Sequence, residues 1–330
     1  MDTIYNPKLV DVLKEKTMKK ITFLALLTII IFSGCAGFKY TDMPALQFQD
    51  IDYSFPTKTV LSNPAVAYAD LGSGENTIIL IHGLASNAGF WRYNAPQLAK
   101  NNRVIVIDLP GYGKSQKGDY PYTLSFYAET VKNLITTLKL KNVTLVGHSM
   151  GGQISIIFAL KYPELIKNLV LAAPAGFEKF QYGEGEWLRN AIDAKGVRLN
   201  PEDGVRKNLA MNFYNWDEKW EWMVEERVRM AKAAEMREFS YAVVKSVGAM
   251  LDEPTFNSIA GITVPTLIVY GKYDGLIPNM YLNPGFPSDV FIQGAAKIKN
   301  SKLVEIDNCG HMIMIEKADE FNKVVLDFLK

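Results

Sequence analysis

Residues 142–151 read NVTLVGHSMG, and this stretch decides the fold of the chain. Its first five residues form an apolar run with β-branched side chains, which is typical of a buried strand. Residues 152–160, which follow it, favour a helix. The G-x-S-x-G turn between them needs small residues at Gly147 and Gly151, because the bend is sharp, and it lifts Ser149 clear of the sheet. The pattern therefore indicates an exposed serine between a strand and a helix N-terminus.

Strands and helices alternate on both sides of this turn. Helical patterns at 88–100 and 123–138 separate apolar runs that have the continuous character of strands buried on both faces. The apolar runs before the pattern changes are 77–81, 103–107, 142–146 and 167–173. This alternation predicts an α/β fold with a mostly parallel central sheet flanked by helices.

The strand pattern stops at about residue 177 and resumes at 264–271 and 302–306. The intervening stretch is charged, helical and aromatic, and it contains four of the five tryptophans. A helical block inserted between strands of one sheet is most simply a cap over the carboxyl edge, where such sheets bind ligands. We therefore expect a core of residues 57–176 and 253–330 and a helical cap of residues 177–252.

The chain contains three histidines, so a base for Ser149 can be sought by elimination. A serine hydroxyl is a weak nucleophile that needs a base within hydrogen-bond reach, and histidine has a suitable pKa. His148 adjoins the serine and should point away from it, and His82 ends an upstream strand. His311 remains, in a loop after the last strand.

A carboxylate is expected to orient that histidine. Asp274 follows the strand after the cap and is the preferred candidate. Three rivals stay open: Asp252 precedes that strand, Asp307 is four residues from the histidine, and Asp108 lies at an earlier strand end, where a turn explains it better.

Five ordered pieces of the sequence resemble the α/β-hydrolase fold family, over about residues 60–330. They are His82-Gly83-Leu84, the loop 108–115 (DLPGYGKS), the turn 147–151, Gly271-Lys272-Tyr273-Asp274 and Gly310-His311. The resemblance implies the serine-nucleophile branch of that family, with Ser149, Asp274 and His311 as the triad. It also implies that the backbone N–H groups of Leu84 and Met150 form the oxyanion hole.

This resemblance implies a hydrolase that cleaves a carboxylic ester without a cofactor. The apolar side chains of the expected cap favour a small or medium acyl group. A thioesterase, a C–C bond hydrolase and an amidase remain alternatives on the same triad, and a non-catalytic binding protein is a more distant one. Two cysteines and three scattered histidines give no zinc-binding spacing, so we expect no metal. The net charge of +1 gives no reason to expect nucleic acid as a partner. The sequence does not determine the oligomeric state.

Residues 18–35 combine two lysines, an apolar run and small residues before Cys35. The apolar run, residues 21–32, is too short to span a membrane, which takes about 20 residues. The stretch resembles a bacterial lipoprotein signal, although Phe32 stands where leucine is usual. We therefore expect a signal segment at 1–34, with a true start at Met18, lipidation of Cys35 and a tether at 35–56. These features predict an extracytoplasmic, membrane-anchored lipoprotein; the alternative is a secreted or periplasmic soluble protein.

Overall fold

The computed structural model describes residues 38–181 and 183–330. The chain divides into two units, residues 1–43 and 44–330, and the second contains every strand and helix of the described residues. The expected signal segment, with Cys35, lies outside the described residues. Among the described residues, no helix has the length and hydrophobicity needed to cross a membrane.

Eight strands form one sheet in the described part of the chain, in the order β1-β2-β4-β3-β5-β6-β7-β8. Strands β3 to β8 run parallel, and β2 pairs antiparallel with both β1 and β4. The strands are β1 (Lys58–Val60), β2 (Val66–Leu71), β3 (Thr77–Ile81), β4 (Arg103–Ile107), β5 (Val143–His148), β6 (Asn168–Ala172), β7 (Thr266–Gly271) and β8 (Ser301–Ile306). The predicted mostly parallel sheet is therefore confirmed, with β1 and β8 at its edges.

Helices cover the sheet in two groups. In one group α3 packs on α4, α4 on β5 and β6, and α10 on β7 and β8; in the other, α2 packs on α12. These helices, with the short α11, are α2 (Ala95–Leu98), α3 (Leu124–Thr137), α4 (Met150–Lys161), α10 (Pro287–Lys297), α11 (Ile313–Glu316) and α12 (Ala318–Phe328). Short 3-10 turns precede β1 or join strands and helices: η1 (Phe48–Asp50), η2 (Ala88–Trp91), η3 (Pro163–Leu165) and η5 (Ile259–Gly261).

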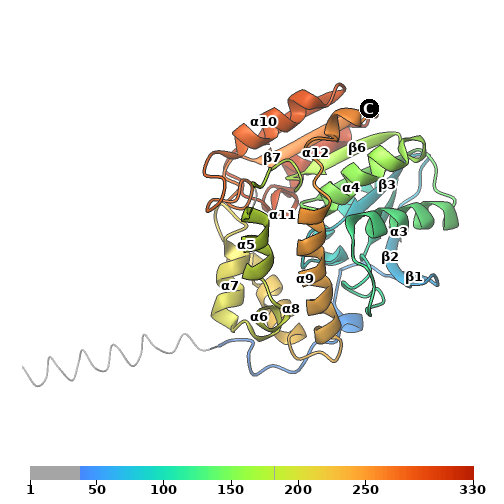
Figure 1. Cartoon of the computed structure of the whole chain (residues 1–330). Helices are drawn as coiled ribbons and strands as arrows, with labels where there is room; N and C mark the ends of the chain where they lie inside the picture. Colours follow the sequence, from blue (N-terminus) through green and yellow to red (C-terminus); the bar gives the residue numbers. More distant parts are fainter. Residues whose placement is uncertain (1–37, 182) are drawn as a thin grey trace, which may run out of the picture. The chain divides into compact units, whose positions relative to one another are not determined.

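Helices between β6 and β7 form the region predicted as a cap. Figure 1 shows them grouped together, away from α10 and α12, and α9 packs on α3. They are α5 (Glu184–Ala191), α6 (Ala194–Leu199), α7 (Glu202–Ala210), α8 (Glu221–Met230) and α9 (Met236–Asp252), with the 3-10 turn η4 (Glu218–Trp220) before α8. All of them fall within residues 177–252.

The central strands are buried along their whole length because both of their faces are covered. Every residue of β3 and of β5 is buried. Helix α4 is buried from Met150 to Ala159 and has no polar stripe, since it lies against the sheet and is covered by α3. This packing fixes the end of β5, and with it the position of the G-x-S-x-G turn.

The structure departs from the sequence prediction at two places. Residues 44–56, expected as part of a tether, belong to the compact unit, and Phe48, Ile51 and Tyr53 are fully buried there. Their spacing gave no helix or strand period because the segment has little regular structure. The helix predicted at 88–100 is instead split into η2 and α2, and Pro96, which has no N–H, lies in the first turn of α2.

Candidate active site

Ser149 occupies a strained backbone position between β5 and α4. Its φ of 52° and ψ of −117° lie outside the regions that residues with a side chain normally adopt. The two flanking glycines make this bend possible, because a Cβ on Gly147 would lie 2.2 Å from the carbonyl oxygen of Gly151. The serine side chain is partly exposed. Within the described residues its hydroxyl makes no hydrogen bond.

Asp274 and His311 form a buried hydrogen-bonded pair. The histidine Nδ1 lies 2.8 Å from Asp274 Oδ2, and both residues are more than nine-tenths buried. The other carboxylate oxygen, Oδ1, accepts hydrogen bonds from the backbone N–H groups of Leu276 (2.8 Å) and Ile277 (3.0 Å). A carboxylate has no proton to donate, so it acts as the acceptor in this hydrogen bond. The histidine therefore donates through Nδ1 and keeps Nε2 as its basic nitrogen.

His148 supports His311 from the other side. Its Nε2 donates to the carbonyl oxygen of His311 at 3.0 Å, and the two rings lie 4.8 Å apart. Burial lowers the pKa of His148 well below its usual value, so the ring is neutral. The sequence predicted that this side chain turns away from the serine, but it gave no sign of the contact with His311.

The loop after β3 packs directly against the serine. A Cβ on Gly83 would lie 2.9 Å from His148 Nδ1 and 3.2 Å from Ser149 Cβ, so glycine is required there. His82 fixes this loop by donating through Nδ1 to the Gly83 carbonyl (2.8 Å) and accepting at Nε2 from the Leu109 N–H (3.1 Å). Burial lowers the pKa of His82 to about 4, which keeps this neutral tautomer.

The predicted oxyanion donors lie on the two sides of this contact. Within the described residues, the backbone N–H groups of Leu84 and Met150 make no hydrogen bond. Met150 is the first residue of α4, where N–H groups lack partners inside the helix. Arg227, from the cap helix α8, donates to the carbonyl oxygen of Ala85, which has a positive φ of 52°.

The three rival carboxylates have other partners. Asp252 pairs with Arg189 and Asp307 pairs with Lys272, in both cases at the surface. Asp108 is buried, and it accepts from Tyr53 Oη, the Ala88 N–H and the Lys114 N–H at 2.7–2.8 Å. Burial raises the pKa of Asp108, and these three hydrogen bonds counteract that effect. Of the four candidates, Asp274 is the one hydrogen-bonded to His311.

Cys309 and a metal ion are the other candidates for a role near His311, and the described residues give neither a place in this site. Cys309 is a buried free thiol whose pKa is raised by burial, as expected of a small packed residue. In the described ranges, no three histidine, cysteine or acidic side chains come together in a way that could hold a metal ion.

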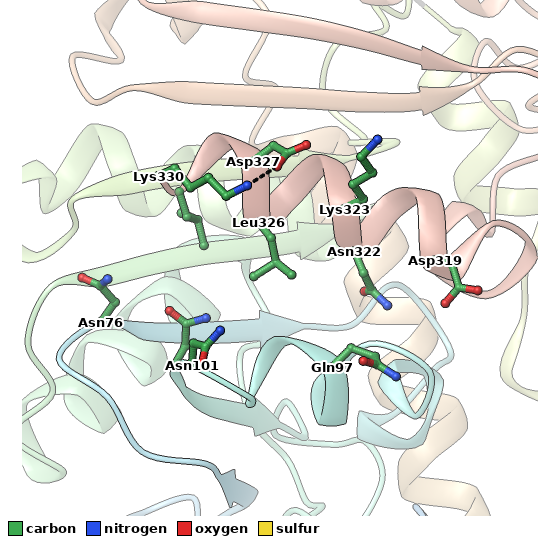
Figure 2. A pocket seen from close by; sticks show the side chains of 11 residues that line it. Asn76, Gln97, Asn101, Asp319, Asn322, Lys323, Leu326, Asp327 and Lys330 are labelled. Carbon is green, nitrogen blue, oxygen red and sulfur yellow. Dashed lines mark hydrogen bonds and ion pairs between the residues drawn. The ribbon is translucent and has the colours of Figure 1, made fainter.

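A cavity of about 630 Å³, lined mostly by residues with polar or charged side chains, lies at the opposite edge of the sheet. Figure 2 shows amide side chains beside the amino ends of β3 and β4 facing helix α12 across it. Its lining includes Asn76, Gln97 and Asn101 from the first side and Lys323 and Asp327 from the helix. Ser149 lies at the carboxyl ends of the strands, so this cavity is not part of the candidate active site.

Residues 76–318 match the family model described as the alpha/beta hydrolase fold. The chain belongs to the alpha/beta hydrolase fold family. This hydrolase is 32% identical, over 274 residues, to 2-hydroxy-6-oxononadienedioate/2-hydroxy-6-oxononatrienedioate hydrolase 2 of Pseudomonas putida. That match covers 80% of this chain and 91% of the relative. The family resemblance inferred from the five sequence pieces is thus confirmed.

Solved structures share the fold of this hydrolase at lower identity. A probable hydrolytic enzyme from Pseudomonas aeruginosa superposes with a TM-score of 0.76 at 23% identity, covering 87% of this chain and 99% of that one. An esterase from Exiguobacterium antarcticum gives a TM-score of 0.69 at 24% identity, covering 83% and 98%. At such identities these likenesses show the common fold.

Proposed function

We propose that this hydrolase cleaves a carboxylic ester through Ser149, His311 and Asp274. The observation that carries the proposal is the Asp274–His311 hydrogen bond, which leaves the histidine Nε2 free to act as a base. The strained turn at Ser149 adds a nucleophile whose oxygen is held out of the sheet.

In the proposed reaction, Ser149 Oγ attacks the acyl carbonyl while His311 Nε2 takes its proton. Asp274 holds the imidazole in the required tautomer and stabilises the imidazolium. The N–H groups of Leu84 and Met150 bind the oxyanion of the tetrahedral intermediate. His311 then protonates the leaving alcohol, and a water molecule, deprotonated by the same histidine, hydrolyses the acyl-enzyme. No step in this scheme calls on a cofactor.

A C–C bond hydrolase is the second candidate, favoured by the Pseudomonas putida relative, whose name describes a hydrolase of a hydroxy-oxo dioate. Arg227 also supports this alternative, since its guanidinium lies against the carbonyl of Ala85 in the loop after β3. A fixed positive charge there would suit a substrate that carries a carboxylate. Thioester and amide cleavage remain alternatives on the same triad.

Two measurements test the ester proposal. Protein lacking residues 1–35 should hydrolyse p-nitrophenyl acyl esters, and Ser149→Ala should abolish that turnover. A fluorophosphonate probe should modify Ser149 and no other residue. Undiminished turnover by the Ser149→Ala variant would refute the mechanism.

A substrate series separates ester cleavage from its alternatives. Matched ester, thioester and amide substrates of increasing acyl length are compared with a 2-hydroxy-6-oxo dienoic acid. The ester proposal expects the highest kcat/KM for an ester of a small or medium acyl group. A dienoic acid cleaved with a higher kcat/KM than every ester would favour the second candidate.

We further propose that Cys35 carries a lipid anchor that holds the enzyme at an extracytoplasmic membrane surface. The proposal rests on the lipoprotein-like pattern of residues 18–35. Cys35→Ala should release the protein from isolated membranes. Continued membrane retention of the variant would contradict lipidation, and a soluble wild-type protein would favour the secreted or periplasmic alternative.

A further inference from the structure

A short part of the cap, residues 211–215 between α7 and η4, lies across the loops of both Asp274 and His311; we call it the cap segment. On the aspartate side, the rings of Tyr214 and Tyr273 stack with centroids 4.4 Å apart. A Cβ on Gly275 would lie 3.1 Å from the carbonyl oxygen of Met211. The cap segment therefore contacts the residues on each side of Asp274.

The same arrangement recurs around the histidine. Met312 donates its backbone N–H to the carbonyl oxygen of Asn212 at 3.1 Å. On the other side of His311, a Cβ on Gly310 would lie 2.7 Å from both Asn212 O and Tyr214 N. The backbone on both sides of His311 is thus in close contact with the cap segment.

Glu316, the last residue of α11, joins these two pieces of chain. Its Oε2 accepts from the N–H of Gly310 at 2.7 Å and of Tyr214 at 3.1 Å. Its Oε1 accepts from the N–H of Asn215 at 3.0 Å. One carboxylate therefore holds the residue before His311 and two residues of the cap segment. Three hydrogen bonds to one side chain restrict its movement, so this connection is stiff.

We propose that Glu316 is a positioning residue that couples the cap to His311, and this inference rests on the proposed function. Catalytic groups must be held within about 0.5 Å of their productive geometry. A misplacement of about 1 Å can cost about a hundredfold in rate. Without the carboxylate, Gly310 loses its hydrogen bond to Glu316, and the backbone before His311 is held less firmly against the cap segment.

The test compares Glu316→Ala and Glu316→Gln with Glu253→Gln in the full-length protein. Glu253 is a matched control, since it also ties the end of a cap helix to the core by accepting from the N–H groups of Leu124 and Ser125. Those two residues begin α3, away from the histidine loop. For each variant, the rate of Ser149 labelling by a fluorophosphonate, the kcat and KM for an ester, and the melting temperature are measured.

We expect Glu316→Ala to lower kcat and the labelling rate by about 10- to 100-fold, with KM changed less than threefold. Glu316→Gln should recover part of the rate, because its carbonyl oxygen can still accept from Gly310 and Tyr214. Glu253→Gln should leave kcat within twofold of the wild type, even if its melting temperature falls as much as that of the Glu316 variants.

Three results would overturn the inference. The first is wild-type labelling and kcat in both Glu316 variants, and the second is an equal loss of kcat in Glu253→Gln. The third is a change confined to KM. If Glu316→Ala does not fold, Glu316→Gln is judged by the same criteria. A wild-type protein that the probe does not label refutes the proposed function itself, which distinguishes that failure from failure of the Glu316 role.

Discussion

Replacing Asp274 by asparagine should remove nearly all activity while leaving the fold intact. The structure determines how the new amide must point. The N–H groups of Leu276 and Ile277 need an acceptor, so the amide oxygen takes the place of Oδ1. The amide NH₂ then faces His311 Nδ1 at the position where Oδ2 lies 2.8 Å away in the wild type.

A donor at that position forces the histidine into the wrong tautomer. Nδ1 has to accept, the ring proton moves to Nε2, and Nε2 can no longer take the proton of Ser149. The loss expected for a wrong-tautomer triad is about 10⁴-fold in kcat, which corresponds to about 5 kcal/mol of transition-state stabilisation. The geometry is nearly isosteric, so we expect the melting temperature to change by only a few degrees.

The assay is steady-state hydrolysis of a p-nitrophenyl ester, with Asp307→Asn as the matched control. Asp307 is also a carboxylate near His311 in the sequence, but it is exposed and bonds Lys272 at 3.2 Å. Its variant should keep kcat within twofold. If Asp274→Asn retained a tenth or more of wild-type kcat, or if Asp307→Asn showed the larger loss, the assignment of the acid would be wrong.

Three further predictions concern buried groups. Burial raises the pKa of Glu226, which hydrogen-bonds Asn87, to about 7, so the folded protein retains a proton that the unfolded chain loses near pH 4.5. The free energy of unfolding should then fall by about 2–3 kcal/mol as the pH rises from about 4.5 to 7. Urea unfolding at pH 5 and 8 should show this fall for the wild type and not for Glu226→Gln. Parallel pH profiles of the two proteins would contradict the prediction. Gly147→Ala should lower the free energy of unfolding by at least about 3 kcal/mol, because its Cβ would lie 2.2 Å from Gly151 O. A wild-type soluble yield and melting temperature would disprove this. The Cys309 thiol, whose pKa is raised by burial, should react with a thiol-specific dye only after unfolding, and stoichiometric labelling of native Cys35→Ala protein would count against this.

Sequence reasoning located the proposed triad because each member lies at a strand end. Ser149, Asp274 and His311 follow β5, β7 and β8, and parallel strands bring their carboxyl ends to one edge of the sheet. The apolar runs and the glycine positions predict these strand ends directly.

The contacts that hold the site could not be predicted in the same way. Glu316 accepts from backbone N–H groups about 100 residues away, and backbone donors carry no sequence signature. His148 contacts a carbonyl oxygen, which any residue at position 311 would supply. The burial of Phe48 and Tyr53 could not be predicted for a related reason. An irregular segment that crosses a core shows neither the helical nor the strand period of apolar residues.

The two edges of the sheet bear on how this protein behaves at high concentration. An exposed edge strand offers unpaired N–H and C=O groups to a second molecule, which can extend the sheet and begin aggregation. Strand β1 is three residues long and starts with exposed Lys58, so it presents a short template. Strand β8 is longer, but Lys302 and Glu305 are exposed along it. A second molecule adding to either edge would have to bury a charge, which favours discrete molecules over filaments.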